Sequence, residues 1–108
     1  MKVCELCEAL SAKALVLPEP EREIEGAYVG DLLSWVMGRA EEKNVWVTIM
    51  SNVNVIAVAS LAAVSCVVFA EGVIPDEDVI KRAETEGINL LSVDSTAFET
   101  CAKISGLI

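Results

Sequence analysis

Residues 45–70 read VWVTIMSNVNVIAVASLAAVSCVVFA, a stretch without any charged side chain. A run of this length is enough to span a bilayer. Polar residues interrupt it at Ser51, Asn52, Asn54, Ser60 and Ser65. No cluster of positive charges flanks it, as a membrane span would favour. Strands of a parallel sheet covered on both faces are almost wholly apolar. We therefore interpret the stretch as a buried strand–helix–strand unit and expect no membrane partner.

The three parts of this unit are expected at Val45–Met50, a middle helix, and Val64–Phe69. The β-branched content of the middle part would also suit a strand, but Asn52 can cap a helix. The apolar face expected for that helix consists of Val53, Ile56, Ala57, Ser60 and Leu61.

Upstream of the unit, helical spacing predicts a short helix over residues 3–11, and two strands are expected at Lys13–Leu17 and Ile24–Val29. Asp31 follows Gly30 and can accept hydrogen bonds from the free amides of a helix that starts there. The apolar stripe of that helix is Leu33, Val36, Met37 and Ala40.

Downstream, the sequence predicts a helix that Asp76 caps and Gly87 ends, followed by a strand at residues 88–93. Thr96 and Glu99 have capping-box spacing and start a last helix. Its inward face is expected to be Phe98, Cys101 and Ala102.

Strands thus alternate with helices, and the connections are too short for anything but crossover units. The predicted fold is α/β, with three α/β/α layers and a largely parallel sheet of about five strands. No linker or internal repeat divides the chain, so residues 1–108 are expected to form a single domain.

The charge balance limits the partners. The chain has 108 residues and a net charge of −9, with 8 basic residues and no histidine. Such a chain repels the phosphates of nucleic acid, so we expect no nucleic-acid partner. The acidic start, MKVCELCEAL, is unlike a secretory signal, which predicts a cytoplasmic location and reduced cysteines.

The pattern GAYVGDLLS at residues 26–34 raises the question of a phosphate-binding loop. A P-loop needs a lysine after its second glycine. Asp31 stands there instead, so we interpret Gly30 as a sharp turn. Without histidine, serine and cysteine lack their usual activating base. We therefore predict no catalytic residues and no cofactor.

The cysteines allow two interpretations. Cys4 and Cys7 have the spacing of half a zinc site, whereas structural zinc takes four ligands. Cys66 and Cys101 are isolated in apolar segments. Packing is the predicted role and no metal site is expected, with a metal or redox module on Cys4 and Cys7 as the alternative.

One constellation can still bind a ligand. The loops after parallel strands meet at one edge of a sheet, where ligands bind. The side chains of these loops suit a small polar ligand or a cation, although roles as helix caps and turn residues explain their presence as well. The candidate ligand-binding residues are Gly30, Asp31, Asn52, Glu71, Gly72, Ser95 and Thr96.

Four stretches together resemble the DRTGG domain family over nearly the whole chain: YVGDLLSWVM, VWVTI, VNVIAVASL and EGVIPDEDVIKRAETEGINLLSVDSTAFE. The resemblance implies a regulatory module, found beside phosphotransacetylase and CBS domains and similar to the amino-terminal domain of HPr kinase/phosphorylase. Of the family's namesake residues only Gly72 is present, because Asn52 and Val53 replace the Asp-Arg pair, and Ala70 and Glu71 precede the glycine.

The resemblance and the missing catalytic groups together predict a stand-alone, non-catalytic regulatory domain that forms a homodimer and senses a small ligand. Tyr28 and Trp35 are candidates for the interface. The alternative is an accessory subunit of a phosphoryl-transfer or redox enzyme that binds a nucleotide or metal together with that partner enzyme.

Overall fold

A computed structural model describes residues 1–108, and strands and helices alternate along most of the chain. The elements are α1 (Val3–Ala9), β1 (Lys13–Val16), β2 (Ala27–Val29), α2 (Leu33–Arg39), β3 (Val45–Thr48), α3 (Asn54–Ala62), β4 (Cys66–Phe69), α4 (Glu77–Glu86), β5 (Leu90–Ser92) and α5 (Ala97–Ser105).

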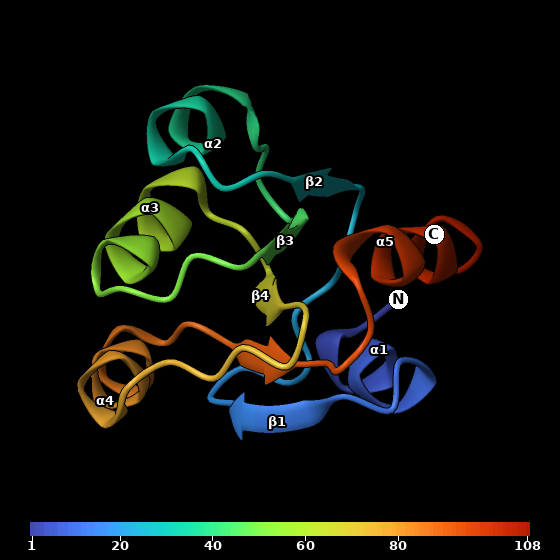
Figure 1. The fold of residues 1–108 in the computed structure, drawn as a ribbon, viewed down its shortest axis with the longest axis horizontal. Helices are drawn as coiled ribbons and strands as arrows, with labels where there is room; N and C mark the ends of the chain where they lie inside the picture. Colours follow the sequence, from blue (N-terminus) through green and yellow to red (C-terminus); the bar gives the residue numbers. More distant parts are fainter.

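The five strands form one sheet in the order β1-β5-β4-β3-β2. Every neighbouring pair is parallel except β1 with β5. Helices α2, α3 and α4 cover one face of the sheet, and α1 and α5 cover the other (Figure 1). The α/β prediction, with three layers and a largely parallel sheet of five strands, is confirmed.

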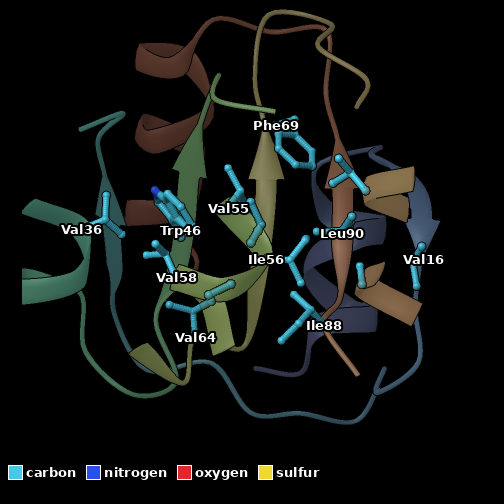
Figure 2. Packing of buried hydrophobic residues seen from close by; sticks show 14 residues of the cluster. Val16, Val36, Trp46, Val55, Ile56, Val58, Val64, Phe69, Ile88 and Leu90 are labelled. Carbon is cyan, nitrogen blue, oxygen red and sulfur yellow. The ribbon is translucent and has the colours of Figure 1, made fainter. Parts of the chain in front are cut away.

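The stretch at residues 45–70 forms β3, α3 and β4, as expected. Both strands are buried along their whole length. Trp46 and Phe69 point into the layer under α2, α3 and α4 (Figure 2), whereas Val47 and Cys66 belong to the core under α1 and α5. A strand buried on both faces has no position that suits a charged side chain, which explains the uncharged run. No helix of the chain has the length and apolarity that crossing a membrane requires.

The face predicted for the middle helix is right for Ile56 and wrong for the other four residues. The buried residues of α3 are Val55, Ile56, Val58 and Ala59. Leu61, expected to be buried, is 72% exposed, and Val53, Ala57 and Ser60 are exposed as well. Because α3 is apolar on nearly every side, its periodicity does not define one face. Contacts with the sheet, α2 and α4 select the buried side instead.

The face predicted for the last helix is right only for Cys101, which is half-buried and packs against the core under α1 and α5. Phe98 is 82% exposed and Ala102 is exposed, whereas Thr100 and Ile104 are buried. The Thr100 hydroxyl donates a hydrogen bond to the Thr96 carbonyl at 2.7 Å, so it is buried with a partner. A threonine with a satisfied hydroxyl can therefore occupy an inward position that its polarity did not suggest.

In α2, only Val36 of the predicted stripe is fully buried, and Met37 is exposed. The predicted starts and ends of α4 and α5 agree better with the structure than the predicted faces do. Gly87 ends α4 with a left-handed φ of 73°, and the Thr96–Glu99 capping box is present. Asp76 is the N-cap of α4, but its side chain makes no capping hydrogen bond.

Candidate functional site

The carboxyl ends of the four parallel strands lie at one edge of the sheet, which we call the carboxyl edge. The registers pair Val29 with Val47, Thr48 with Phe69, and Phe69 with Ser92. Figure 2 shows β3, β4 and β5 pointing the same way, with β1 opposed. All seven candidate ligand-binding residues follow these ends in the chain, so they lie along this edge.

Gly30 and Asp31 follow β2 in the chain and accept hydrogen bonds from β3 and the residue after it. The indole Nε1 of Trp46 donates to the Gly30 carbonyl at 2.9 Å. Asp31 Oδ1 accepts from Thr48 Oγ1 at 2.8 Å and from the Ile49 amide at 2.9 Å. Asp31 is therefore not the cap of α2, contrary to the prediction. Leu32 is the N-cap position, and its apolar side chain has no atom that could cap the helix. The Asp31 carboxylate bonds to Thr48 and Ile49 instead.

Asn52 caps α3 from just outside the helix. Its Oδ1 accepts from the Asn54 amide at 2.9 Å, which occupies the acceptor that a ligand would use. The predicted capping role of Asn52 is thus confirmed, although the helix itself begins at Asn54.

Glu71, Gly72 and Ser95 are brought together by the backbone. The Glu71 amide donates to the Ser95 carbonyl and the Gly72 amide donates to the Val93 carbonyl, both at 2.8 Å. Glu71 and Gly72 both have left-handed backbones, with φ of 61° and 72°. A Cβ at Gly72 would lie 3.5 Å from Asp94 Oδ1. Two left-handed residues in succession make the tight turn that joins these loops.

Thr96 is the N-cap of α5 and makes its hydrogen bonds within that helix. Its hydroxyl accepts from the Glu99 amide at 3.1 Å, and its amide donates to the Glu99 carboxylate at 3.0 Å. These bonds to Thr96 lower the pKa of Glu99 below its ordinary value of 4.5. The structure therefore assigns a capping or connecting contact to most of the candidate residues, and their role toward a ligand stays a prediction.

The largest cavity lies elsewhere, between β2 and α5. It has a volume of about 430 Å³ and no charged residue in its lining, which consists of Ala27, Tyr28, Val29, Cys101, Ile104, Ser105 and Ile108. Sequence reasoning missed this groove, because it depends on β2 being the last strand of the sheet. Only Tyr28 among its residues was a candidate contact residue.

Cys66 is buried in the layer under α1 and α5, and Cys7 and Cys101 are half-buried against it, whereas Cys4 is half-buried on α1 outside that cluster. Nowhere in the chain do three or more His, Cys, Asp or Glu side chains gather closely enough to bind a metal. Burial raises the pKa of the Cys66 thiol to about 12, and burial also raises the pKa values of Cys7 and Cys101. A thiol with a raised pKa is seldom the reactive thiolate at neutral pH.

The family described as "DRTGG domain" matches residues 5–107. The solved CBS and DRTGG domains of the regulatory region of Clostridium perfringens pyrophosphatase, complexed with the activator diadenosine tetraphosphate, are similar in fold, with 16% identity and a TM-score of 0.72. That similarity covers 95% of this chain and 45% of the solved chain. No curated protein matches the sequence.

Proposed function

Because this chain belongs to the DRTGG domain family, we propose that it is a non-catalytic regulatory domain that acts by self-association and protein contacts. One observation carries the self-association: the outer side of β2 is an unpaired sheet edge beside an uncharged groove.

The register shows which backbone groups are free. The Gly26 carbonyl accepts from Val45 and the Gly30 amide donates to Val47, so these residues face β3. Backbone groups alternate between the two sides of a strand. Ala27 and Val29 therefore direct their amides and carbonyls away from the sheet, where a strand of a second copy can pair with them.

The charge distribution favours this edge for self-association. Across a two-fold axis the same surface patch lies on both sides, so a patch with an excess of acids would face the same excess on the second copy. A net charge of −9 makes most of the surface repulsive. The groove between β2 and α5 has no charged lining residue, and Val29 and Ile108 expose apolar surface there.

Light scattering after gel filtration tests the dimer. We expect a dimer at high micromolar concentration, and we expect Val29→Lys to convert it to a monomer, because lysine blunts an edge strand. Leu61→Lys is the matched control, since Leu61 is more exposed but lies on the opposite helical layer. A monomeric parent protein, or equal effects of the two variants, would contradict the proposal. Circular dichroism checks that both variants fold.

Nucleotide sensing is the second candidate function, and the pyrophosphatase complex with a nucleotide activator supports it. The carboxyl edge carries Asp31, Glu71 and Asp94, so a polyphosphate needs a bridging cation there. We expect nucleotides to raise the Tm only with Mg²⁺, and Glu71→Gln to abolish that rise. Glu71 is exposed and its carboxylate makes no hydrogen bond or ion pair within the chain, so we expect this variant to keep the fold. A shift without Mg²⁺, or one that Glu71→Gln leaves unchanged, would argue against this site.

A further inference from the structure

A row of exposed apolar side chains follows the carboxyl ends of the four parallel strands. Each of the helices α2, α3, α4 and α5 has at least one such residue at or just before its first turn. They are Leu32 before α2, Val53 before α3, Ile74 before α4 and Phe98 in α5, with Val29 and Ile49 at the strand ends. We call these six residues the apolar rim.

The rim is built into the fold and is not a random scatter of exposed residues. It holds most of the large hydrophobic side chains that the chain exposes, including the most exposed one, Phe98. The four strands are adjacent in the sheet. At about 4.8 Å between strands, their ends extend over about 14 Å. Exposed apolar side chains that gather at one edge of the sheet are typical of an interaction site.

The charges around the rim identify the occupant. The loops and helix starts at residues 29–33, 49–54, 70–78 and 93–99 contain no lysine or arginine. They contain the acids Asp31, Glu71, Asp76, Glu77, Asp78, Asp94 and Glu99. Only Glu77 makes an ion pair, with Lys81. Three of the acids, Glu77, Asp78 and Glu99, lie in first turns where the helix dipole offsets them.

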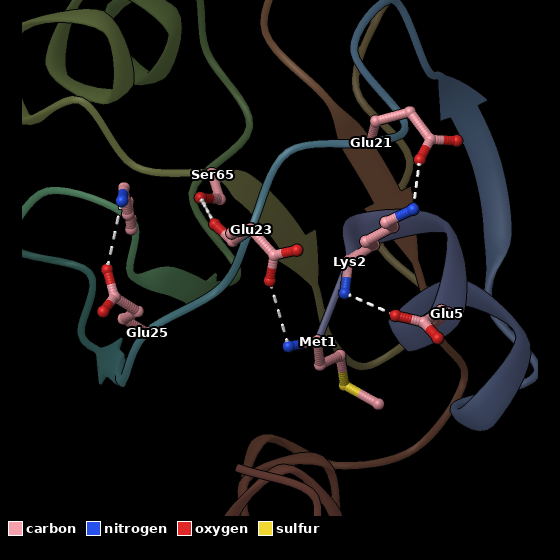
Figure 3. Close-up of polar contacts among 8 residues, drawn as sticks. Met1, Lys2, Glu5, Glu21, Glu23, Glu25 and Ser65 are labelled. Atoms are coloured by element: carbon pink, nitrogen blue, oxygen red, sulfur yellow. Dashed lines mark hydrogen bonds and ion pairs between the residues drawn. The ribbon is translucent and has the colours of Figure 1, made fainter.

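The opposite situation holds in the loop at residues 19–25, where each glutamate has a basic partner. Glu19 pairs with Arg22, Glu21 with Lys2, Glu23 with the amino terminus, and Glu25 with Lys43. Figure 3 shows several of these pairs. The chain therefore compensates its acids at one surface and leaves them uncompensated around the rim.

We infer that the apolar rim binds an amphipathic, basic helix of a partner protein. This inference rests on the proposed role through protein contacts and names the partner's chemistry. Apolar side chains spaced along about three helical turns cover about 16 Å, close to the spread of the four strand ends that the rim follows. Lysine or arginine on either side would meet the uncompensated acids. A second copy is disfavoured, because acids would then face acids.

The probe is a synthetic helical peptide with leucines three and four positions apart and lysines between them. A matched peptide carries glutamate in place of lysine. We expect the lysine peptide to bind in calorimetry and to shift the amide signals of Leu32, Ile49, Ile74 and Phe98 in nuclear magnetic resonance spectra. The glutamate peptide should not bind. Absence of binding by the lysine peptide, or shifts confined to other surfaces, would overturn the inference.

Two pairs of variants separate the rim from general attraction to an acidic protein. Phe98→Ala should raise the Kd of the lysine peptide about ten-fold, because a buried aromatic side chain often supplies much of the binding energy of an interface. Leu61→Ala should change this Kd less than about two-fold. Glu71→Gln with Asp94→Asn should weaken it about five-fold. Glu41→Gln with Glu42→Gln changes the net charge equally and should have little effect. Equal effects within either pair would refute the assignment.

Self-association at the rim is a separate outcome of the same measurements. If Phe98→Ala converts a dimer to a monomer, the rim joins two copies and the inference is wrong. Because Val29 belongs to both the rim and the β2 edge, the proposed dimer is also measured with Ala27→Lys, which is exposed on β2 and lies outside the rim. Loss of the dimer in Ala27→Lys without loss of peptide binding is then distinguishable from loss of peptide binding in Phe98→Ala.

Discussion

Cys66 shows how burial controls the chemistry of single residues in this domain. The residue lies in β4 between neighbours on both sides, and none of it is exposed. Burial, with a smaller contribution from Cys7, raises the pKa of its thiol to about 12. A neutral thiol behaves as a small hydrophobic group. This supports the packing role that the sequence predicted for Cys66.

The same shift predicts a pH dependence of stability. The pKa of Cys66 rises from an ordinary 9.0 to about 12 on folding. Between these values the unfolded chain loses the proton first, so the free energy of unfolding falls as the pH rises. The slope is at most about 1.4 kcal/mol per pH unit. Denaturant titrations at several pH values should show that Cys66→Ala removes this part of the slope. An equal slope in both proteins would contradict the assignment.

At the scale of elements, the starts of α4 and α5 offer a matched comparison. Thr96 accepts a hydrogen bond from the Glu99 amide, whereas the side chain of Asp76 accepts none at the equivalent position of α4. We expect Thr96→Ala to cost about 1 kcal/mol in the free energy of unfolding. Asp76→Ala should cost clearly less. Urea unfolding of both variants measures these two losses in the free energy of unfolding. A larger loss for Asp76→Ala than for Thr96→Ala would show that Asp76 caps α4 in solution.

The order and type of the elements could be predicted, because their local signals are strong. Alternating apolar and polar segments placed every strand and helix, and Gly87 and the Thr96 capping box are local features. The buried faces of α3 and α5 could not be predicted in the same way. Leu61 and Phe98 are apolar yet exposed, because the neighbouring elements decide which side of each helix is covered.

The candidate site likewise has features that local sequence signals predict and features that depend on tertiary contacts. Its place at the carboxyl edge follows from parallel strands and could be predicted. The contact of Asp31 with Thr48 depends on β2 lying next to β3, which is tertiary information. The groove between β2 and α5 likewise depends on the strand order, and no pattern in the sequence signals it.

At the scale of the whole molecule, the arrangement of acids matters more than their number. The glutamates of residues 19–25 lie beside basic groups, while the acids of the carboxyl edge, apart from Glu77, make no ion pair. The fold therefore carries a local repulsion that is not distributed over its surface. Repulsion of this kind destabilises the compact state and is relieved when a basic partner binds.

A salt titration of stability tests this uneven repulsion. We expect Glu71→Gln with Asp94→Asn to raise the Tm by about 2 °C at about 0.01 M salt, because two unpaired charges leave a crowded edge. At about 1 M salt the gain should vanish, since screening then acts over a few ångströms. Glu21→Gln with Glu25→Gln changes the net charge equally but removes the ion pairs with Lys2 and Lys43. That variant should show no gain at low salt, and an equal gain in both would mean that only net charge matters.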